Sequence, residues 1–551
     1  MIRPHIRLTA YLLLSCAVLA TVVSGSRAAN SAAPASSAGS MRSAGMMRSA
    51  GSTKPGDDTI QNFKKYFRTY KETAIRVEAI LTLEGTEDVA IVDTLVPILK
   101  DPDGEVVRNT VRVLAAFKTR PPIDALLAVL KGDKTEAVRT GILRAIAEGK
   151  YTDTTQFVAV CLADKSWDVR RRAMQALAAS NDPAIAPQIA PLCDDQEVAV
   201  RCEALDCLTK LKSDLVVPKA IGSLNHAVWQ VRVSAINALT KVRSKDAIEP
   251  LIARLAVEEG RLVPDIAEAL ANLTGKELGA EPEKWKAWWA ENKAAFVLPT
   301  AEAIAYLRGH RDAATGSGKS NFPKSGVAEY HGIQTPSRSI MFVIDVSGSM
   351  EAEVVEKERF SDGNYPSFLR IDIVKTELSR TIDRLEPFVN FNILAFATKV
   401  DPWKQKLVQA NVLNKSAAKD WVKGLIAIGG ASKEDLATVG FTGSAGLEMG
   451  KTNTFGALMQ ALNVKTGPKT GGLGAAENKD YTVDVDTIFF LSDGRPTVGD
   501  FNDPDDILRE VKAANELRKV VIHTIAIGEF QKDFMRKIAE QNGGVFVDLG
   551  K

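Results

Sequence analysis

The sequence predicts an α-solenoid followed by an α/β domain with a doubly wound, mostly parallel sheet. One observation is an arginine that recurs about every 31 residues in the N-terminal half, each time inside an Ala/Leu-rich amphipathic stretch. Another is the change of pattern from residue 339 onward, where short apolar runs alternate with helical stretches. The chain has 551 residues, which is long enough for each domain to have its own hydrophobic core.

Charge and cysteine content exclude several classes of protein. The chain has 70 Lys and Arg against 68 Asp and Glu, so its formal net charge is +2 and no nucleic-acid partner is expected. Outside the N-terminal segment it has four cysteines, with no CxxC pair or Cys/His cluster that would hold zinc. For Cys161, Cys193, Cys202 and Cys207 we expect buried thiols, with a disulfide as the alternative in an oxidising compartment.

The first 29 residues have the pattern of a secretory signal peptide. Arg3 and Arg7 precede an apolar run from Leu8 to Val23, and small residues follow. We therefore expect an extracytoplasmic protein, periplasmic, cell-surface or secreted, without a transmembrane segment after cleavage. A lipoprotein box ending at Cys16 and an uncleaved anchor are the alternatives. Residues 30–57 are rich in Ser, Ala, Gly and Met, which predicts a flexible linker.

Residues 58–297 form the predicted helical-repeat domain. The recurring arginines are Arg76, Arg108, Arg139, Arg170, Arg201 and Arg232. A seventh unit, "VPDIAEALANL", has Pro264 in the arginine's place. A period near 30 with two short helices per unit is typical of a solenoid, because one helix pair cannot cover its own apolar face.

This pattern resembles HEAT repeats of the short, bilin-lyase type. The resemblance implies that the arginines form a ladder with acidic residues such as Asp133, Asp164 and Asp195, each six residues before an arginine. A basic ligand-binding stripe is the alternative. We expect Trp285, Trp288 and Trp289 to close the last repeat as an apolar cap, with a partner surface as the alternative. Residues 298–330 are the expected interdomain linker.

Residues 331–551 form the predicted α/β domain. Its expected strands lie in "SIMFVIDVSGSM", "FVNFNILAFAT", "DTIFFLSDG", "VVIHTIAIG" and "GVFVDLG". Its expected helices lie in "IDIVKTELSRTIDRL", "NTFGALMQALN", "PDDILREVKAANELR" and "KDFMRKIAEQN". Ligands of such sheets bind at the carboxyl ends of the strands, where the strand order reverses.

Hydroxyl and carboxylate side chains occur at this edge. Asp345, Ser347 and Ser349 follow the first strand, and Asp493 follows the "IFFLS" strand. These hard oxygen donors favour Mg²⁺, while zinc and copper, which prefer softer ligands, are disfavoured.

"DVSGSM" resembles the DxSxS metal-ion-dependent adhesion site of the von Willebrand factor A family. "GKTNTFGAL" resembles the threonine loop of that family, and "LSDG" its final aspartate. The resemblance implies that Ser347, Ser349 and Thr452 touch the metal directly, and that Asp345 and Asp493 act directly or through water. It implies Mg²⁺, with Mn²⁺ or Ca²⁺ as alternatives, and a protein ligand that offers a carboxylate to the metal.

Two insertions depart from the family pattern, at 351–361 and 431–451. The second one leaves Thr454 and Ser432 as alternatives to Thr452. For the first, our hypothesis is that Glu351 or Glu353 shields the metal until a partner displaces it.

The sequence thus predicts an exported, non-enzymatic binding, adhesion or scaffold protein with no catalytic residues and no organic cofactor. An accessory subunit of an ATPase-type, chelatase-type or envelope-remodelling complex is the alternative. A relative of bilin lyases is a third hypothesis, for which the sequence offers no catalytic group. Phosphate-loop patterns at 313–320 and 445–452 lack the preceding strand that nucleotide binding needs. We expect His523 in the core, and Asp503 or Asp505 as a helix cap.

Overall fold

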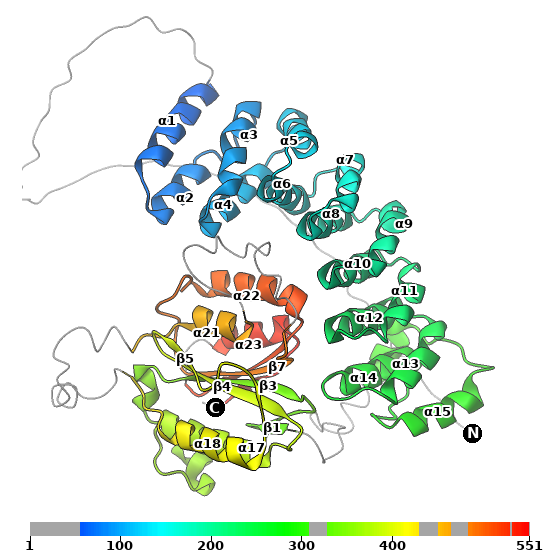
Figure 1. Ribbon diagram of the computed structural model, residues 1–551, viewed down its shortest axis with the longest axis vertical. Coiled ribbons are helices and arrows are strands. Elements are labelled where there is room, and N and C mark those ends of the chain that lie inside the picture. The colour runs from blue at the N-terminus through cyan, green and yellow to red at the C-terminus, as the bar shows by residue number, and fades with distance from the viewer. Residues whose placement is uncertain (1–54, 308–327, 429–449, 464–482, 529–531, 550–551) are drawn as a thin grey trace, which may run out of the picture. The chain divides into compact units, whose positions relative to one another are not determined.

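The computed structural model describes residues 55–307, 328–428, 450–463, 483–528 and 532–549 (Figure 1). The expected signal peptide, the linker as far as residue 54, Ser432, the phosphate-loop pattern at 313–320 and most of the one at 445–452 lie outside these residues. In the described part of the chain, no helix combines the length and apolar character needed to cross a membrane.

The N-terminal region is a series of helix pairs that starts at α1 (Pro55–Thr69), three residues earlier than expected. The following α-helices are α2 (Thr73–Leu81), α3 (Val89–Leu95), α4 (Gly104–Ala115), α5 (Arg120–Gly132), α6 (Glu136–Gly149), α7 (Thr155–Ala159), α8 (Trp167–Ala179), α9 (Ala186–Ile189), α10 (Val198–Lys210), α11 (Val216–Ser223), α12 (Trp229–Val242), α13 (Ile248–Leu255), α14 (Leu262–Thr274) and α15 (Pro282–Asn292). Short 3₁₀ helices are η1 (Val96–Lys100), η2 (Val160–Ala163), η3 (Pro183–Ile185), η4 (Ala190–Asp194) and η5 (Lys245–Ala247).

The second helix of each pair stacks on the second helix of the next pair. This row runs α2, α4, α6, α8, α10, α12 and α14, and Figure 1 shows it along the inner side of the solenoid. Its fully buried side chains belong to one continuous apolar core, which includes Ile80, Val111, Ile142, Met174, Leu205, Leu239 and Leu270. The predicted α-solenoid is therefore confirmed, and stacking of neighbours is what buries each helix pair.

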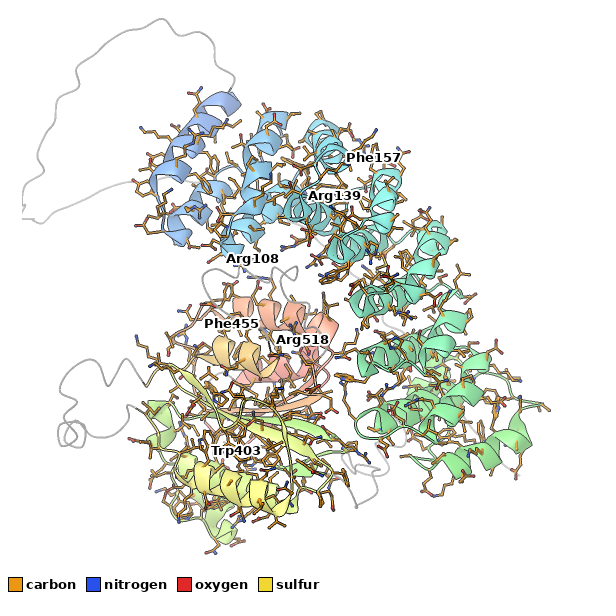
Figure 2. The ribbon with its side chains drawn as sticks, in the orientation of Figure 1. Arg108, Arg139, Phe157, Trp403, Phe455 and Arg518 are labelled. Carbon is orange, nitrogen blue, oxygen red and sulfur yellow. The ribbon has the colours of Figure 1, made fainter. Side chains whose placement is uncertain are left out.

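The recurring arginines lie on these second helices, and four of the six form the expected ladder. The guanidinium of Arg170 donates from Nε and Nη2 to the Asp195 carboxylate, at 2.9 and 2.7 Å, and from Nη1 to the Asp164 carbonyl at 2.8 Å. Arg139, labelled in Figure 2, pairs with Asp164. Each of these arginines therefore reaches the acidic residue 25 positions further on, in the next repeat.

Arg76 with Asp101 and Arg232 with Glu258 repeat this arrangement at other steps of the solenoid. Arg108 and Arg201 depart from it. Arg108 pairs with Glu105 on its own helix at 3.6 Å instead of with Asp133, and in the case of Arg201 His226 occupies the position of the acidic residue. Within the described residues no carboxylate pairs with Arg201. Its Nε donates instead to the Asp195 carbonyl at 2.5 Å.

The tryptophan segment closes the last repeat, as expected. Trp285 on α15 is fully buried, and its indole Nε1 donates to the Gly279 carbonyl at 2.8 Å. Trp289 is also buried, and its ring lies edge-on to Phe296 at 5.4 Å. The four cysteines of this region are buried, free thiols.

The α/β domain has a sheet of order β5-β4-β3-β7-β8-β9, in which all neighbours are parallel except β5, which is antiparallel to β4. The strands are β3 (Ser339–Asp345), β4 (Asn390–Phe396), β5 (Val400–Pro402), β6 (Val408–Gln409), β7 (Thr487–Ser492), β8 (Val521–Ala526) and β9 (Phe546–Asp548). The chain passes from β3 to β4 on one side and returns to β7 on the other. The order therefore reverses at β3, where β3 and β7 lie side by side.

Helices cover both faces of this sheet, as predicted (Figure 1). Alternate residues of β3 face opposite ways: Phe342 packs with α17 (Arg370–Arg384) and α18 (Val412–Lys423). Val343 packs with α21 (Thr454–Ala461), α22 (Pro504–Arg518) and α23 (Lys532–Gln541). Asp503 is the cap of α22, since its Oδ1 accepts from the amides of Asp505 and Asp506.

Several short elements were not predicted. A hairpin of β1 (Ala328–Tyr330) and β2 (Ile333–Thr335) begins inside the expected interdomain linker, where residues 301–307 are also helical. At the sheet edge, β5 and β6 both pair antiparallel with β4, and Trp403 (Figure 2) stacks on Phe391 at 5.5 Å. The turns η6 (Gly348–Glu351) and η7 (Lys357–Gly363) lie between β3 and α17.

Candidate metal centre

The loop that leaves β3 is held by the carboxylate of Asp345. Its Oδ1 accepts from the Ser347 amide at 2.8 Å, and its Oδ2 accepts from the Ser492 hydroxyl at the end of β7, at 2.5 Å. Because Asp345 is fully buried, these two bonds fix the loop against the neighbouring strand. Sequence reasoning had not identified Ser492 as part of the site.

Ser347, Ser349 and Asp493 form a continuous hydrogen-bonded row above the sheet. The hydroxyl oxygens of Ser347 and Ser349 are 3.1 Å apart, and the Ser349 hydroxyl donates to Asp493 Oδ1 at 2.7 Å. Asp345 and Asp493 follow neighbouring parallel strands, so the topology brings their carboxylates to the same edge. Four of the five predicted site residues therefore lie together.

Thr452 reaches the same place from the loop before α21. A methyl group placed on Gly494 would lie 3.2 Å from Thr452 Oγ1 and 3.4 Å from Ser349 Oγ, so both hydroxyls lie beside this glycine. The loop is anchored by the Gly348 amide, which donates to the Gly450 carbonyl at 3.1 Å, and by paired bonds between Thr452 and Thr497. Thr454, in contrast, opens α21, and its buried hydroxyl has no hydrogen-bond partner among the described residues.

A basic side chain that the sequence did not reveal also enters the site. Arg370, the first residue of α17, donates from Nη1 to Asp493 Oδ2 at 2.5 Å and is 8% exposed. The same nitrogen lies 3.4 Å from the Ser349 carbonyl oxygen. Asp493 thus receives a hydroxyl on one oxygen and a guanidinium on the other.

The two carboxylates raise an electrostatic problem that a cation would relieve. Burial, and then the negative charge of Asp493, raise the pKa of Asp345 to about 7. Among the described residues, no cluster of three or more His, Cys, Asp or Glu side chains could hold a metal. A cation at this edge would therefore depend on the hydroxyl oxygens, and this donor set fits a hard cation such as Mg²⁺.

Two acidic residues of the first insertion are candidates to shield a metal. Glu353 is exposed and forms an ion pair with Lys357 at 2.5 Å. Glu351 ends η6 and is partly buried. The hypothesis that either of them shields a metal stays a prediction.

Comparisons with known proteins find matches to the helical-repeat region and to the α/β domain. Residues 338–548 match the family model described as von Willebrand factor type A domain, and residues 61–147, 123–198, 154–228 and 186–271 match the one described as HEAT repeats. The inter-alpha-trypsin inhibitor heavy chain H4 of Homo sapiens is 26% identical over 215 residues, which are 39% of this chain and 18% of that protein. The chain therefore spans about a fifth of the length of this curated relative.

Solved structures also show similarity to each of these two regions. A von Willebrand factor type A protein from Catenulispora acidiphila covers 39% of this chain and 39% of its own, at 18% identity and a TM-score of 0.26. The complex of CpcE and CpcF of phycocyanin lyase from Nostoc covers 45% of this chain and 97% of its own, at 15% identity and a TM-score of 0.24.

Proposed function

The chain joins HEAT repeats to a von Willebrand factor type A domain, which is consistent with a role in protein interaction, and we propose that it is an exported, non-enzymatic binding protein. In this proposal, Asp345, Ser347, Ser349, Thr452 and Asp493 hold one divalent cation, Mg²⁺ or a similar hard ion. The ligand is a protein that presents a carboxylate to that cation.

The observation that carries the proposal is the convergence of oxygen atoms at the reversal point of the sheet. Ser347, Ser349 and Asp493 are joined through their side chains, and the Thr452 hydroxyl lies beside them at Gly494. Three separate chain segments, at residues 347–349, 452 and 493, supply these groups, whereas a simple turn or helix cap would involve only one segment.

Each residue would have a distinct task. Ser347, Ser349 and Thr452 offer neutral hydroxyl oxygens, while Asp345 keeps the loop in place through the Ser347 amide and the Ser492 hydroxyl. Asp493 brings negative charge from the neighbouring strand. When bound, the cation would supply an open coordination position for a carboxylate oxygen of the ligand. The solenoid is proposed as a second, elongated docking surface.

Calorimetric titration of the full chain with MgCl₂ and MnCl₂ tests the cation site. We expect one ion per chain, and a loss of affinity of at least about tenfold in Asp345→Asn. Asp486→Asn is the matched control: this partly buried aspartate precedes the other end of β7 and accepts from the hydroxyls of Ser337 and Thr487. If neither ion binds the wild-type chain, or if Asp345→Asn binds as well as the control, the proposal is wrong.

The protein ligand can be sought in the cell envelope. We expect wild-type protein to retain a partner in the presence of Mg²⁺ and to release it when a chelator is added. Asp345→Asn should retain that partner in neither condition, and Asp486→Asn should behave as wild type. A partner that stays bound to Asp345→Asn would bind elsewhere on the molecule.

A further inference from the structure

The ion pair between Arg370 and Asp493 is a feature that metal binding alone does not explain. A ligand carboxylate for a divalent cation is expected to be available to that cation, yet Asp493 Oδ2 already accepts a charged hydrogen bond of 2.5 Å from Arg370. Both side chains are buried, Asp493 at 2% and Arg370 at 8% exposure, so water screens their attraction little.

The fold holds Arg370 in this position. The first insertion closes on itself at its base: the Val354 amide donates to the Phe368 carbonyl at 2.9 Å, and the Arg370 amide donates to the Ala352 carbonyl at 3.0 Å. An antiparallel bridge between Glu353 and Leu369 lies between these two bonds. The chain therefore returns from the insertion to residues 352–354, and this pairing places Arg370 next to the loop that follows β3.

Gly528, which follows β8, leaves room for the ion pair of Arg370 and Asp493. A methyl group added to Gly528, after β8, would lie 3.0 Å from the Asp493 carbonyl oxygen and 3.4 Å from Arg370 Cζ. Arg370 Nε is buried without a hydrogen-bond partner among the described residues. Most buried polar atoms have a hydrogen-bond partner, so the unpaired Nε is a cost of the orientation in which Nη1 contacts Asp493.

We propose that Arg370 is an internal counter-cation that neutralises Asp493 while the site holds no metal, and that it thereby lowers the affinity of the site for divalent cations. This inference rests on the proposed function. A positive charge next to the metal position repels a divalent ion, while the same charge stabilises the empty site by pairing with a buried carboxylate. Removing it should therefore have two effects of opposite sign.

The test is Arg370→Gln in the full chain, measured by Mg²⁺ titration and by thermal unfolding in the presence of a chelator. We expect Mg²⁺ to bind at least about tenfold more tightly. We expect the metal-free unfolding temperature of this domain to fall by roughly 5 °C or more, because Asp493 is left unpaired. Arg380→Gln is the matched control, since Arg380 lies on the same helix and pairs with Glu377 at 2.6 Å.

Equal or weaker Mg²⁺ binding in Arg370→Gln, with binding by wild type intact, would overturn this inference and leave the proposed function standing. Tighter Mg²⁺ binding by Arg370→Gln than by both wild type and Arg380→Gln would support it. If no variant and no wild-type chain bound Mg²⁺, both proposals would fall.

A second variant covers a failure of Arg370→Gln to fold. In Arg370→Gln/Asp493→Asn the unpaired charge is removed, so we expect the metal-free stability of the wild type to return. If the double variant also failed to fold, the pairing would not be what Arg370 contributes, and the inference would be wrong.

Discussion

His523 shows how a single buried side chain makes the stability of the α/β domain depend on pH. Burial lowers the pKa of its imidazole to about 4, and its Nδ1 accepts from the Val545 amide at 3.0 Å, which requires the neutral ring. The unfolded chain takes up the proton near pH 6.5. The stabilising contribution of His523 is therefore complete above about pH 6.5 and decreases as the pH falls toward 4, by at most about 3 kcal/mol.

His523→Asn should reduce this pH dependence, because the amide oxygen can still accept from Val545 but does not titrate. Hydrogen exchange in β8 and β9 between pH 7 and 4, corrected for intrinsic rates, measures the effect. An unchanged slope in His523→Asn would show that other groups cause the pH dependence.

The choice between the two threonines of the loop can also be tested at this scale. Thr452→Ala should weaken Mg²⁺ binding by at least about tenfold, because its hydroxyl lies beside Ser349. Thr454→Ala should leave the affinity unchanged, since the Thr454 hydroxyl lies unpaired in the first turn of α21. The reverse result would make Thr454 the ligand.

Arg370 marks the limit of prediction from the sequence at this scale. Asp345, Ser347, Ser349 and Asp493 could be found because each adjoins an apolar strand, so strand topology alone brings them together. Arg370 follows an insertion of irregular structure, and only the bonds at the base of that insertion bring it to the site. Nothing in its immediate sequence distinguishes it from other helix-starting residues.

At the scale of the element, the arginine ladder has one step, at Arg201, where the imidazole of His226 replaces the carboxylate. The His226 Nδ1 accepts from the Val228 amide at 3.1 Å, as the Asp164 carboxylate accepts from Ser166 at 2.8 Å, so the local turn is preserved while Arg201 lacks its carboxylate. His226→Asp should keep the turn and pair with Arg201, which we expect to stabilise the solenoid by about 1 kcal/mol.

Urea unfolding monitored by circular dichroism measures this gain. His226→Asn is the matched control, because it preserves the turn without adding charge and should give no gain. Equal stabilisation by both substitutions would mean that the turn, and not the ion pair, limits this step.

The strands and helices of the α/β domain were predictable where an apolar run was long enough to show its period. The predicted helix "PDDILREVKAANELR" coincides with α22, and four predicted parallel strands contain β3, β4, β7 and β8. The three-residue β5 and two-residue β6 have no period to detect, and their pairing with β4 depends on tertiary contacts. The resemblance to HEAT repeats likewise implied a ladder, but that each arginine pairs with the acidic residue about 25 positions further on is seen only once the helices stack.

At the scale of the whole molecule, a destabilising substitution in the solenoid should affect only the repeats next to it. In a solenoid each repeat contacts only its neighbours, so losing the cap should affect the last repeats alone. Trp285→Ala removes a fully buried side chain and should cost about 4 kcal/mol locally. We expect faster hydrogen exchange in α13–α15 and unchanged exchange in α4–α8.

Trp288→Ala provides the comparison, because Trp288 is only partly buried and should have a smaller effect. Faster exchange along the whole array after Trp285→Ala would mean that the repeats unfold as one unit.

The pairing of each arginine with the following repeat also has a consequence for how the number of repeats can change in evolution. Arg139 and Arg170 each bond the carboxylate of the following repeat, so a unit that has both residues brings one donor for its successor and one acceptor for its predecessor. A tandem duplication of one unit would therefore insert complete links at both new junctions. Array length, and with it the reach of the protein, could change through recombination without any compensating mutation.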